Sequence, residues 1–116
     1  DFVKVTEDKA VISLTFEDGS IGSIHYFANG GKSFPKERIE VFCENAVLQL
    51  DNFIKLRGFG WKGFTKMNLW SQDKGQKNCV NAFMKSVREG GTNPIPEDEI
   101  FEIARVSVDI AEMLRK

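Results

Sequence analysis

The chain has 116 residues, of which 41% are hydrophobic and 28% charged, with 16 Lys and Arg against 17 Asp and Glu. That length fits one domain, and the composition is ordinary for a soluble globular protein. The net charge of −1 argues against nucleic-acid binding, and no apolar run approaches the roughly 20 residues of a membrane span. Since residues 1–9 are polar and unlike a signal peptide, we expect a cytoplasmic protein.

The first residues indicate that the chain continues a longer one. Phe2–Thr6 have the composition of a short strand, because β-branched and aromatic residues favour strands. They begin, however, without a cap, a turn or an initiating Met. We therefore expect a piece of a larger protein.

The strongest local pattern is a hairpin between Ala10 and Asn29. Before the turn, apolar residues occupy every second position: Ala10, Ile12, Leu14 and Phe16. Asp18-Gly19 supplies the tolerance for positive φ that a tight connection needs. After the turn a second alternating run begins at Ile21, and an isolated hairpin of this kind needs further elements on its apolar face.

Three further strands are predicted from alternation of apolar and polar residues. They cover residues 36–43, 46–50 and 53–57, with turns at Glu44-Asn45 and Asp51-Asn52, and residues 67–70 favour an edge strand. Consecutive strands this closely spaced join most simply as a meander.

The segment from Gly58 to Phe64 breaks every period, because three glycines alternate with large aromatic rings. One interpretation is an aromatic ligand-binding loop that includes Trp61. The other, which we favour, is that the rings anchor a flexible connection onto the sheet.

The last third of the chain changes to a helical period. Residues 73–89 carry Val80, Phe83, Met84 and Val87 at i, i+3, i+4 and i+7, with a cap expected at Ser71 or Asp73 and a stop at Gly90-Gly91. After Pro94 and Pro96, three acids open a second helix. Its apolar stripe contains Ile100, Ile103, Ala104, Ser107, Ile110, Ala111 and Leu114.

Strands followed by helices predict an α+β fold, with an open antiparallel, meander-like β-sheet and two C-terminal helices packed on one face. We expect a single domain over residues 1–116. The opposite face is expected to carry Val11, Ile24, Tyr26 and Phe42, which favours a partner domain or subunit there.

Catalytic and metal-binding motifs are missing from the sequence. It has no P-loop, no G-x-G-x-x-G that opens a helix after a strand and no G-x-S-x-G. Cys43 and Cys79 lie far apart in the sequence, and His25 is the single histidine. A structural zinc site is therefore not expected, and the two cysteines are expected to be reduced, half-buried thiols. His25 lies in a strand pattern, and a role as general base requires a carboxylate or substrate partner.

Lys32, Lys36 and Arg38 form a basic group that suits an anionic substrate such as a phosphate or carboxylate. The more common cause of such a group is a solvated sheet edge, where lysine blocks strand pairing. Glu37, Glu40 and Glu44 are expected to neutralise part of it.

Three segments taken in order resemble the C-terminal domain of the Gfo/Idh/MocA oxidoreductases. They are DGSIGSIHYF, ERIEVFCENAVLQLDNF and FMKSVREGGTNPIPEDEIFEIARVSVDIAEMLR, and the resemblance covers nearly the whole chain. HYFANGGKSFPKERIEVF and LDNFIKLRGFGW are most similar to the bi-domain members, in which the dehydrogenase follows a zinc-dehydrogenase-like half.

The resemblance implies a parent enzyme that binds NAD or NADP in an N-terminal Rossmann domain and oxidises or reduces a sugar, nucleotide sugar or cyclitol. The family's Glu-Lys-Pro lysine and D-x-x-x-H histidine would lie upstream of Asp1, and His25 matches neither. This fragment is therefore expected to carry no catalytic residue and to bind no cofactor itself. Its expected substrate-side residues are Lys32, Lys36, Arg38 and Trp61, which suit charge-assisted hydrogen bonds and ring stacking on a sugar.

Two hypotheses remain after the sequence is read. The first is a substrate-wall and dimerisation domain, with a homodimer formed through the sheet face that lacks helices. In the second, the chain is a free-standing α+β module that binds a ligand or a protein without catalysis. The sheet face would alternatively meet the absent Rossmann domain, in which case the fragment would be a monomer.

Overall fold

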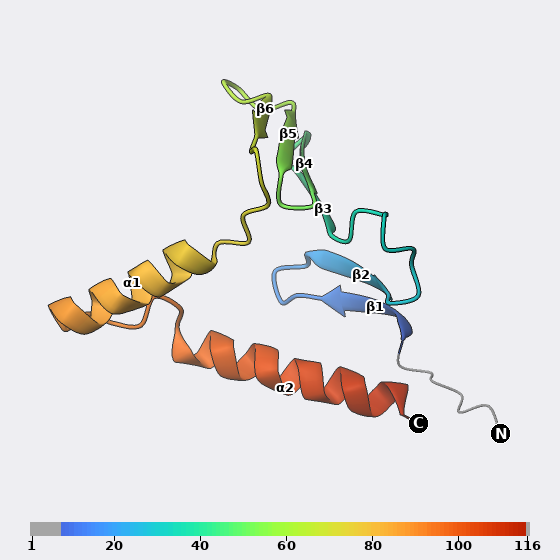
Figure 1. Ribbon diagram of the computed structural model, residues 1–116. Helices are drawn as coiled ribbons and strands as arrows, with labels where there is room; N and C mark the ends of the chain where they lie inside the picture. The colour runs from blue at the N-terminus through green and yellow to red at the C-terminus, as the bar shows by residue number, and fades with distance from the viewer. Residues whose placement is uncertain (1–7, 116) are drawn as a thin grey trace. The chain divides into compact units, whose positions relative to one another are not determined.

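The computed structural model describes residues 8–115 and confirms an α+β fold with open antiparallel sheets and two C-terminal helices (Figure 1). The strand expected at Phe2–Thr6 lies outside the described residues. The chain divides into two compact units. One contains β1, β2 and α2, and the other, Lys32–Pro94, contains β3 to β6 and α1.

The predicted hairpin is present as β1 (Lys9–Thr15) and β2 (Ile21–Phe27), paired antiparallel. Its connection depends on Gly19, whose φ of 85° is reached at little cost only by glycine. Asp18 closes the turn, since its carboxylate accepts hydrogen bonds from the Ser20 backbone N–H at 2.9 Å and the Ser20 hydroxyl at 3.0 Å.

The register of this hairpin corrects the expected assignment of faces. Ile12 lies directly opposite Ile24, and Ala10 lies opposite Tyr26, and directly opposed residues of antiparallel strands share a face. Ile24 and Tyr26 therefore belong to the apolar face of β1, away from Val11. The sequence alternation was right within each strand, but the pairing between strands was not.

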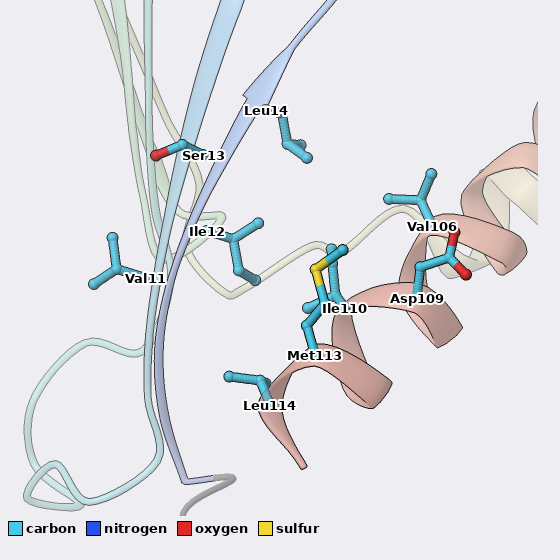
Figure 2. A pocket seen from close by; sticks show the side chains of 9 residues that line it. All are labelled: Val11, Ile12, Ser13, Leu14, Val106, Asp109, Ile110, Met113 and Leu114. Atoms are coloured by element: carbon cyan, nitrogen blue, oxygen red, sulfur yellow. The ribbon is translucent and has the colours of Figure 1, made fainter. Parts of the chain in front are cut away.

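Helix α2 (Glu97–Leu114) begins after Pro96 as expected, with three acids in its first turn. Its half-buried side chains include Val106, Ile110 and Leu114. In Figure 2, Ile12 points from β1 toward these residues, while Val11 points away. The apolar face of the hairpin is therefore the face that α2 approaches.

The second unit holds a four-stranded antiparallel sheet with the strands in chain order. They are β3 (Arg38–Cys43), β4 (Ala46–Asp51), β5 (Lys55–Phe59) and β6 (Lys66–Asn68). The meander is thus present, but the described strands form two separate sheets where one was expected.

Two tight turns connect the three longer strands of this sheet. Glu44 and Asn45 have φ of 46° and 63°, and Asn52 and Phe53 have φ of 50° and 54°. In the two-residue β3–β4 connection, positive φ at both residues matches the twist of the flanking strands. The β4–β5 connection has three residues, because Asp51 pairs with Lys55. The second turn lies one residue later than predicted, at Asn52-Phe53, because Phe53 takes a conformation that aromatic residues rarely adopt.

The register gives the four-stranded sheet two different faces. The apolar face carries Ile39, Val41, Cys43, Ala46, Leu48, Leu50, Leu56 and Met67. The opposite face carries Arg38, Glu40, Gln49, Asp51, Lys55, Arg57, Lys66 and Asn68, with Phe42, Val47 and Phe59 at one end. Such alternation is typical of a sheet with one face packed and one face in water.

Helix α1 (Gln76–Glu89) starts three residues after the predicted Asp73 and ends as predicted before Gly90. Gly75, with φ of 80°, occupies the N-cap and offers no side chain to the first turn. None of the α1 residues is buried. Its predicted stripe, Val80, Phe83, Met84 and Val87, is 40–61% exposed.

Little of the described chain forms a buried core. Among its hydrophobic residues only Ala10 and Ala46 are buried, and neither helix has a buried residue. Ile39, Val41 and Met67 on the apolar face of the larger sheet are each almost half exposed. That face is one surface that suits contact with another protein or domain.

Candidate functional site

The expected substrate-side residues lie on two different parts of the second unit. Lys32 and Lys36 are exposed in the loop before β3, and neither forms an ion pair within residues 8–115. Arg38 begins β3 and is already engaged, because its guanidinium contacts Glu40 at 2.9 Å and Asp51 at 3.8 Å. The two loop lysines, unlike Arg38, keep their charges free for a ligand.

Trp61 is held by the sheet. Its indole N–H donates a hydrogen bond of 3.0 Å to the backbone carbonyl of Val47, and 39% of the residue remains exposed. Asp51, the partner of Arg38, lies four residues along β4 from Val47. At about 3.3 Å per residue this separates the two positions by about 13 Å, so Arg38 and Trp61 do not meet in one small site.

The glycines around Trp61 explain why the loop takes this path. A Cβ on Gly60, where φ is 76°, would lie 2.7 Å from the Asn45 carbonyl oxygen. A Cβ on Gly58 would lie 2.6 Å from the ring of Phe64. The loop therefore packs its backbone against the sheet, and these contacts match the anchoring interpretation. A ligand role for Trp61 stays a prediction.

The contacts of His25 are with residues two positions away on its own strand, β2. Its Nε2 lies 3.2 Å from Ser23 Oγ, and its ring meets Phe27 edge-on at 6.1 Å. Within residues 8–115 no carboxylate pairs with it. The Ser23–His25 pair lacks the third group that orients the base in nucleophilic sites.

A set of contacts at the β4–β5 turn was not predicted from the sequence. The Gln72 side-chain amide donates 3.0 Å hydrogen bonds to both the backbone and side-chain oxygens of Asn52. The Asp73 backbone N–H bonds the Phe53 carbonyl at 3.2 Å. Residues 72–73 are therefore bonded to the Asn52-Phe53 turn. These contacts stabilise the positive φ angles of both turn residues.

Lys74 completes this set of contacts. Its ammonium forms an ion pair with Glu37 Oε1 and lies 5.6 Å from the centroid of the Phe53 ring. The second carboxylate oxygen, Glu37 Oε2, is buried with no hydrogen-bond partner. Sequence spacing gave no signal for this pair, because 37 residues separate its members.

Two apolar hollows lie on the described surface. The first, about 380 Å³, separates β1 from α2 and has Ser13 and Asp109 as its polar lining residues (Figure 2). Asp109 is paired with Arg105 at 3.5 Å. The second, about 260 Å³, lies beside β4 to β6 with Asp73 at its edge. Both lack the several converging polar groups that a catalytic pocket needs.

The described residues form neither a candidate metal cluster nor a disulfide. Within residues 8–115 no three His, Cys, Asp or Glu side chains are arranged to hold a metal ion. Cys43 and Cys79 are free, as expected, but both are exposed where half-buried thiols were expected. Among the described helices none is long and apolar enough to cross a membrane.

Comparison with known proteins adds no family to these observations. No protein-family model, curated protein or solved structure matches the chain.

Proposed function

We propose that the chain is the substrate-wall and subunit-contact domain of an NAD(P)-dependent oxidoreductase that acts on a sugar, nucleotide sugar or cyclitol. The observation that carries the proposal is the exposed apolar face of the β3–β6 sheet. Ile39, Val41 and Met67 lie on it at 47%, 48% and 49% exposure. Exposed apolar side chains gathered on one face mark a surface that contacts another protein or domain.

The ordered resemblance to the C-terminal domain of the Gfo/Idh/MocA enzymes supports the same function. In this proposal NAD or NADP binds a Rossmann domain upstream of Asp1, and that domain supplies the catalytic lysine and histidine. The present chain contributes substrate contacts at two separate places, from Lys32, Lys36 and Arg38 at the start of β3 and from Trp61 about 13 Å away along β4. Arg38 would orient an anionic group through the guanidinium N–H donors that Glu40 and Asp51 leave free.

The coding sequence upstream of Asp1 provides the direct test. We expect a strand, a G-x-G-x-x-G turn and a helix, followed by Glu-Lys-Pro and D-x-x-x-H. An upstream region without these motifs would overturn the oxidoreductase function and leave the free-standing binding module.

The subunit contact has a separate test on the chain itself. We expect light scattering to report a homodimer formed through the apolar face of β3–β6, with a two-fold interface. Val41→Glu places a charge on that face and should give a monomer. Phe42→Glu, the adjacent residue on the opposite face and 73% exposed, is the matched control and should leave the dimer intact.

Two outcomes would contradict the homodimer. A monodisperse wild-type monomer would mean that another domain covers the face. Equal effects of Val41→Glu and Phe42→Glu would mean that the dimer uses some other surface.

A further inference from the structure

Three cations lie together on the polar face of strands β5 and β6. Arg57 is directly opposite Lys66, and Lys55 lies two residues before Arg57 on the same face. All three are exposed. We name these residues the basic cluster.

The register brings Arg57 and Lys66 especially close. The Gly58 backbone N–H bonds the Thr65 carbonyl at 2.9 Å, which makes Arg57 and Lys66 a pair without hydrogen bonds between them. In such a pair the Cβ atoms are about 4.5–5.5 Å apart, and like charges directly opposite are destabilising. A folded sheet therefore keeps two cations at a position where opposite charges would stabilise it.

The other half of the same face shows the usual arrangement. Arg38 is paired with Glu40 and Asp51, and Gln49 donates a 3.2 Å hydrogen bond to Glu40. These are the two acids of this face. Asp51 lies opposite Lys55, yet no carboxylate forms an ion pair with any member of the basic cluster within residues 8–115. Positive charge is thus neutralised on β3 and β4 and left uncompensated on β5 and β6.

We propose that the basic cluster binds a phosphate or diphosphate group. Arginine presents a planar fork that binds phosphate oxygens in pairs, and the two lysines add point charges on either side. Gln49, opposite Arg57, adds the second N–H of its amide, since only one is used by the bond to Glu40. Phe59, on the same face and 54% exposed, offers a ring surface to a group attached to the phosphate. This site does not depend on the oxidoreductase function.

Calorimetric titration of the 116-residue chain with inorganic pyrophosphate tests the site. We expect saturable binding that weakens as salt rises. Arg57→Gln and Lys66→Gln should each lower the affinity at least tenfold. Lys85→Gln removes an exposed lysine from α1 and is the matched control, with affinity unchanged.

Lys66→Glu separates binding from folding. It creates an opposite-charge pair with Arg57, so we expect a higher melting temperature together with loss of pyrophosphate binding. A destabilised Lys66→Glu variant would contradict the like-charge pairing on which the site rests.

Parallel titrations identify where the phosphate comes from. Tighter binding of uridine diphosphate than of pyrophosphate supports a soluble nucleotide, and binding to phosphatidic acid vesicles alone supports a lipid headgroup. Failure of every phosphate probe at millimolar concentration overturns the proposal. So would equal binding by wild type, Arg57→Gln and Lys66→Gln, or binding of a single-stranded oligonucleotide with no measurable affinity for pyrophosphate.

Discussion

The two units of the chain differ in how far a helix covers the apolar face of the sheet. In the first, α2 directs half-buried Val106, Ile110 and Leu114 toward the apolar face of β1. In the second, the apolar stripe of α1 is 40–61% exposed, and Ile39 and Val41 on the apolar face of β3–β6 are almost half exposed. The same ingredients, amphipathic strands and an amphipathic helix, thus give one partly covered sheet and one uncovered sheet.

The two units therefore gain their stability from different contacts. In the hairpin unit, α2 brings half-buried side chains to the hollow beside β1, so substitutions of those side chains should have a moderate effect on stability. The four-stranded sheet depends on its tight turns and on loops bound to it, including the Trp61 bond to Val47 and the Lys74 pair with Glu37. Substitutions that disturb these turns and loops should therefore lower the free energy of unfolding more than substitutions in α1 do.

The largest expected effect is that of Gly60→Ala. The new methyl group would approach the Asn45 carbonyl oxygen to 2.7 Å at a backbone φ of 76°. Alanine in this left-handed conformation, with the added clash, should lower the free energy of unfolding by about 2–3 kcal/mol. Urea denaturation followed by circular dichroism measures it.

Gly30→Ala is the control for that prediction. A Cβ there would meet no atom within 4 Å, so the change should be neutral or stabilise by up to about 1 kcal/mol. Equal losses at Gly60 and Gly30 would show that the loop geometry around Trp61 contributes nothing specific.

A smaller effect distinguishes the two helices. Ile110→Ala removes a half-buried side chain that faces β1, and should cost about 1–2 kcal/mol, less than the roughly 2–5 kcal/mol of a fully buried site. Val80→Ala in α1, where the valine is 59% exposed, should stay within about 0.5 kcal/mol. Thermal denaturation of both variants makes the comparison. A larger loss at Val80 would mean that α1, not α2, covers a sheet.

The smallest effect concerns the turn of the hairpin. The backbone N–H of Ser20, followed by its hydroxyl, lowers the pKa of Asp18 below its ordinary value of 3.8. The pKa of Asp18 is lower in the folded state than in the unfolded state, so the ionised carboxylate stabilises the fold. This stabilisation is present above pH 3.8 and is lost as the pH falls through the folded-state pKa. Ser20→Ala should raise the Asp18 pKa only partly, since the backbone donor remains.

Titration of the Asp18 carboxyl carbon by NMR checks this prediction. Asp18→Asn serves as the control, because it removes the ionisation and should flatten this part of the pH dependence of stability. An Asp18 pKa that is the same in wild type and in Ser20→Ala would rule out the hydroxyl as a contributor.

Much of the secondary structure followed from local pattern. Alternation in β1 and β3, the Asp18-Gly19 turn and the helical spacing in α1 and α2 predicted these elements to within a few residues. Such features depend on residues two to four positions apart in the chain, so they can be predicted from the sequence alone. The acids at the start of α2 and Gly90 at the end of α1 were predicted for the same reason.

Pairings between distant residues were decided only by the tertiary structure. Alternation shows which residues of one strand share a face, but it does not show which residue of the next strand lies opposite. A shift of one residue reverses the face, which is why Tyr26 was assigned to the wrong side of the hairpin. The positive φ of Phe53 depends on contacts from residues 72–74.

The candidate sites follow the same division. Lys32, Lys36, Arg38 and Trp61 were chosen by residue type and proximity in sequence, whereas the structure engages Arg38 with acids and Trp61 with β4. The sequence determined that this is an α+β chain of amphipathic strands and helices. Only the register placed Arg57 against Lys66, because opposition across strands is set by long-range hydrogen bonding and turn geometry, which sequence spacing does not record.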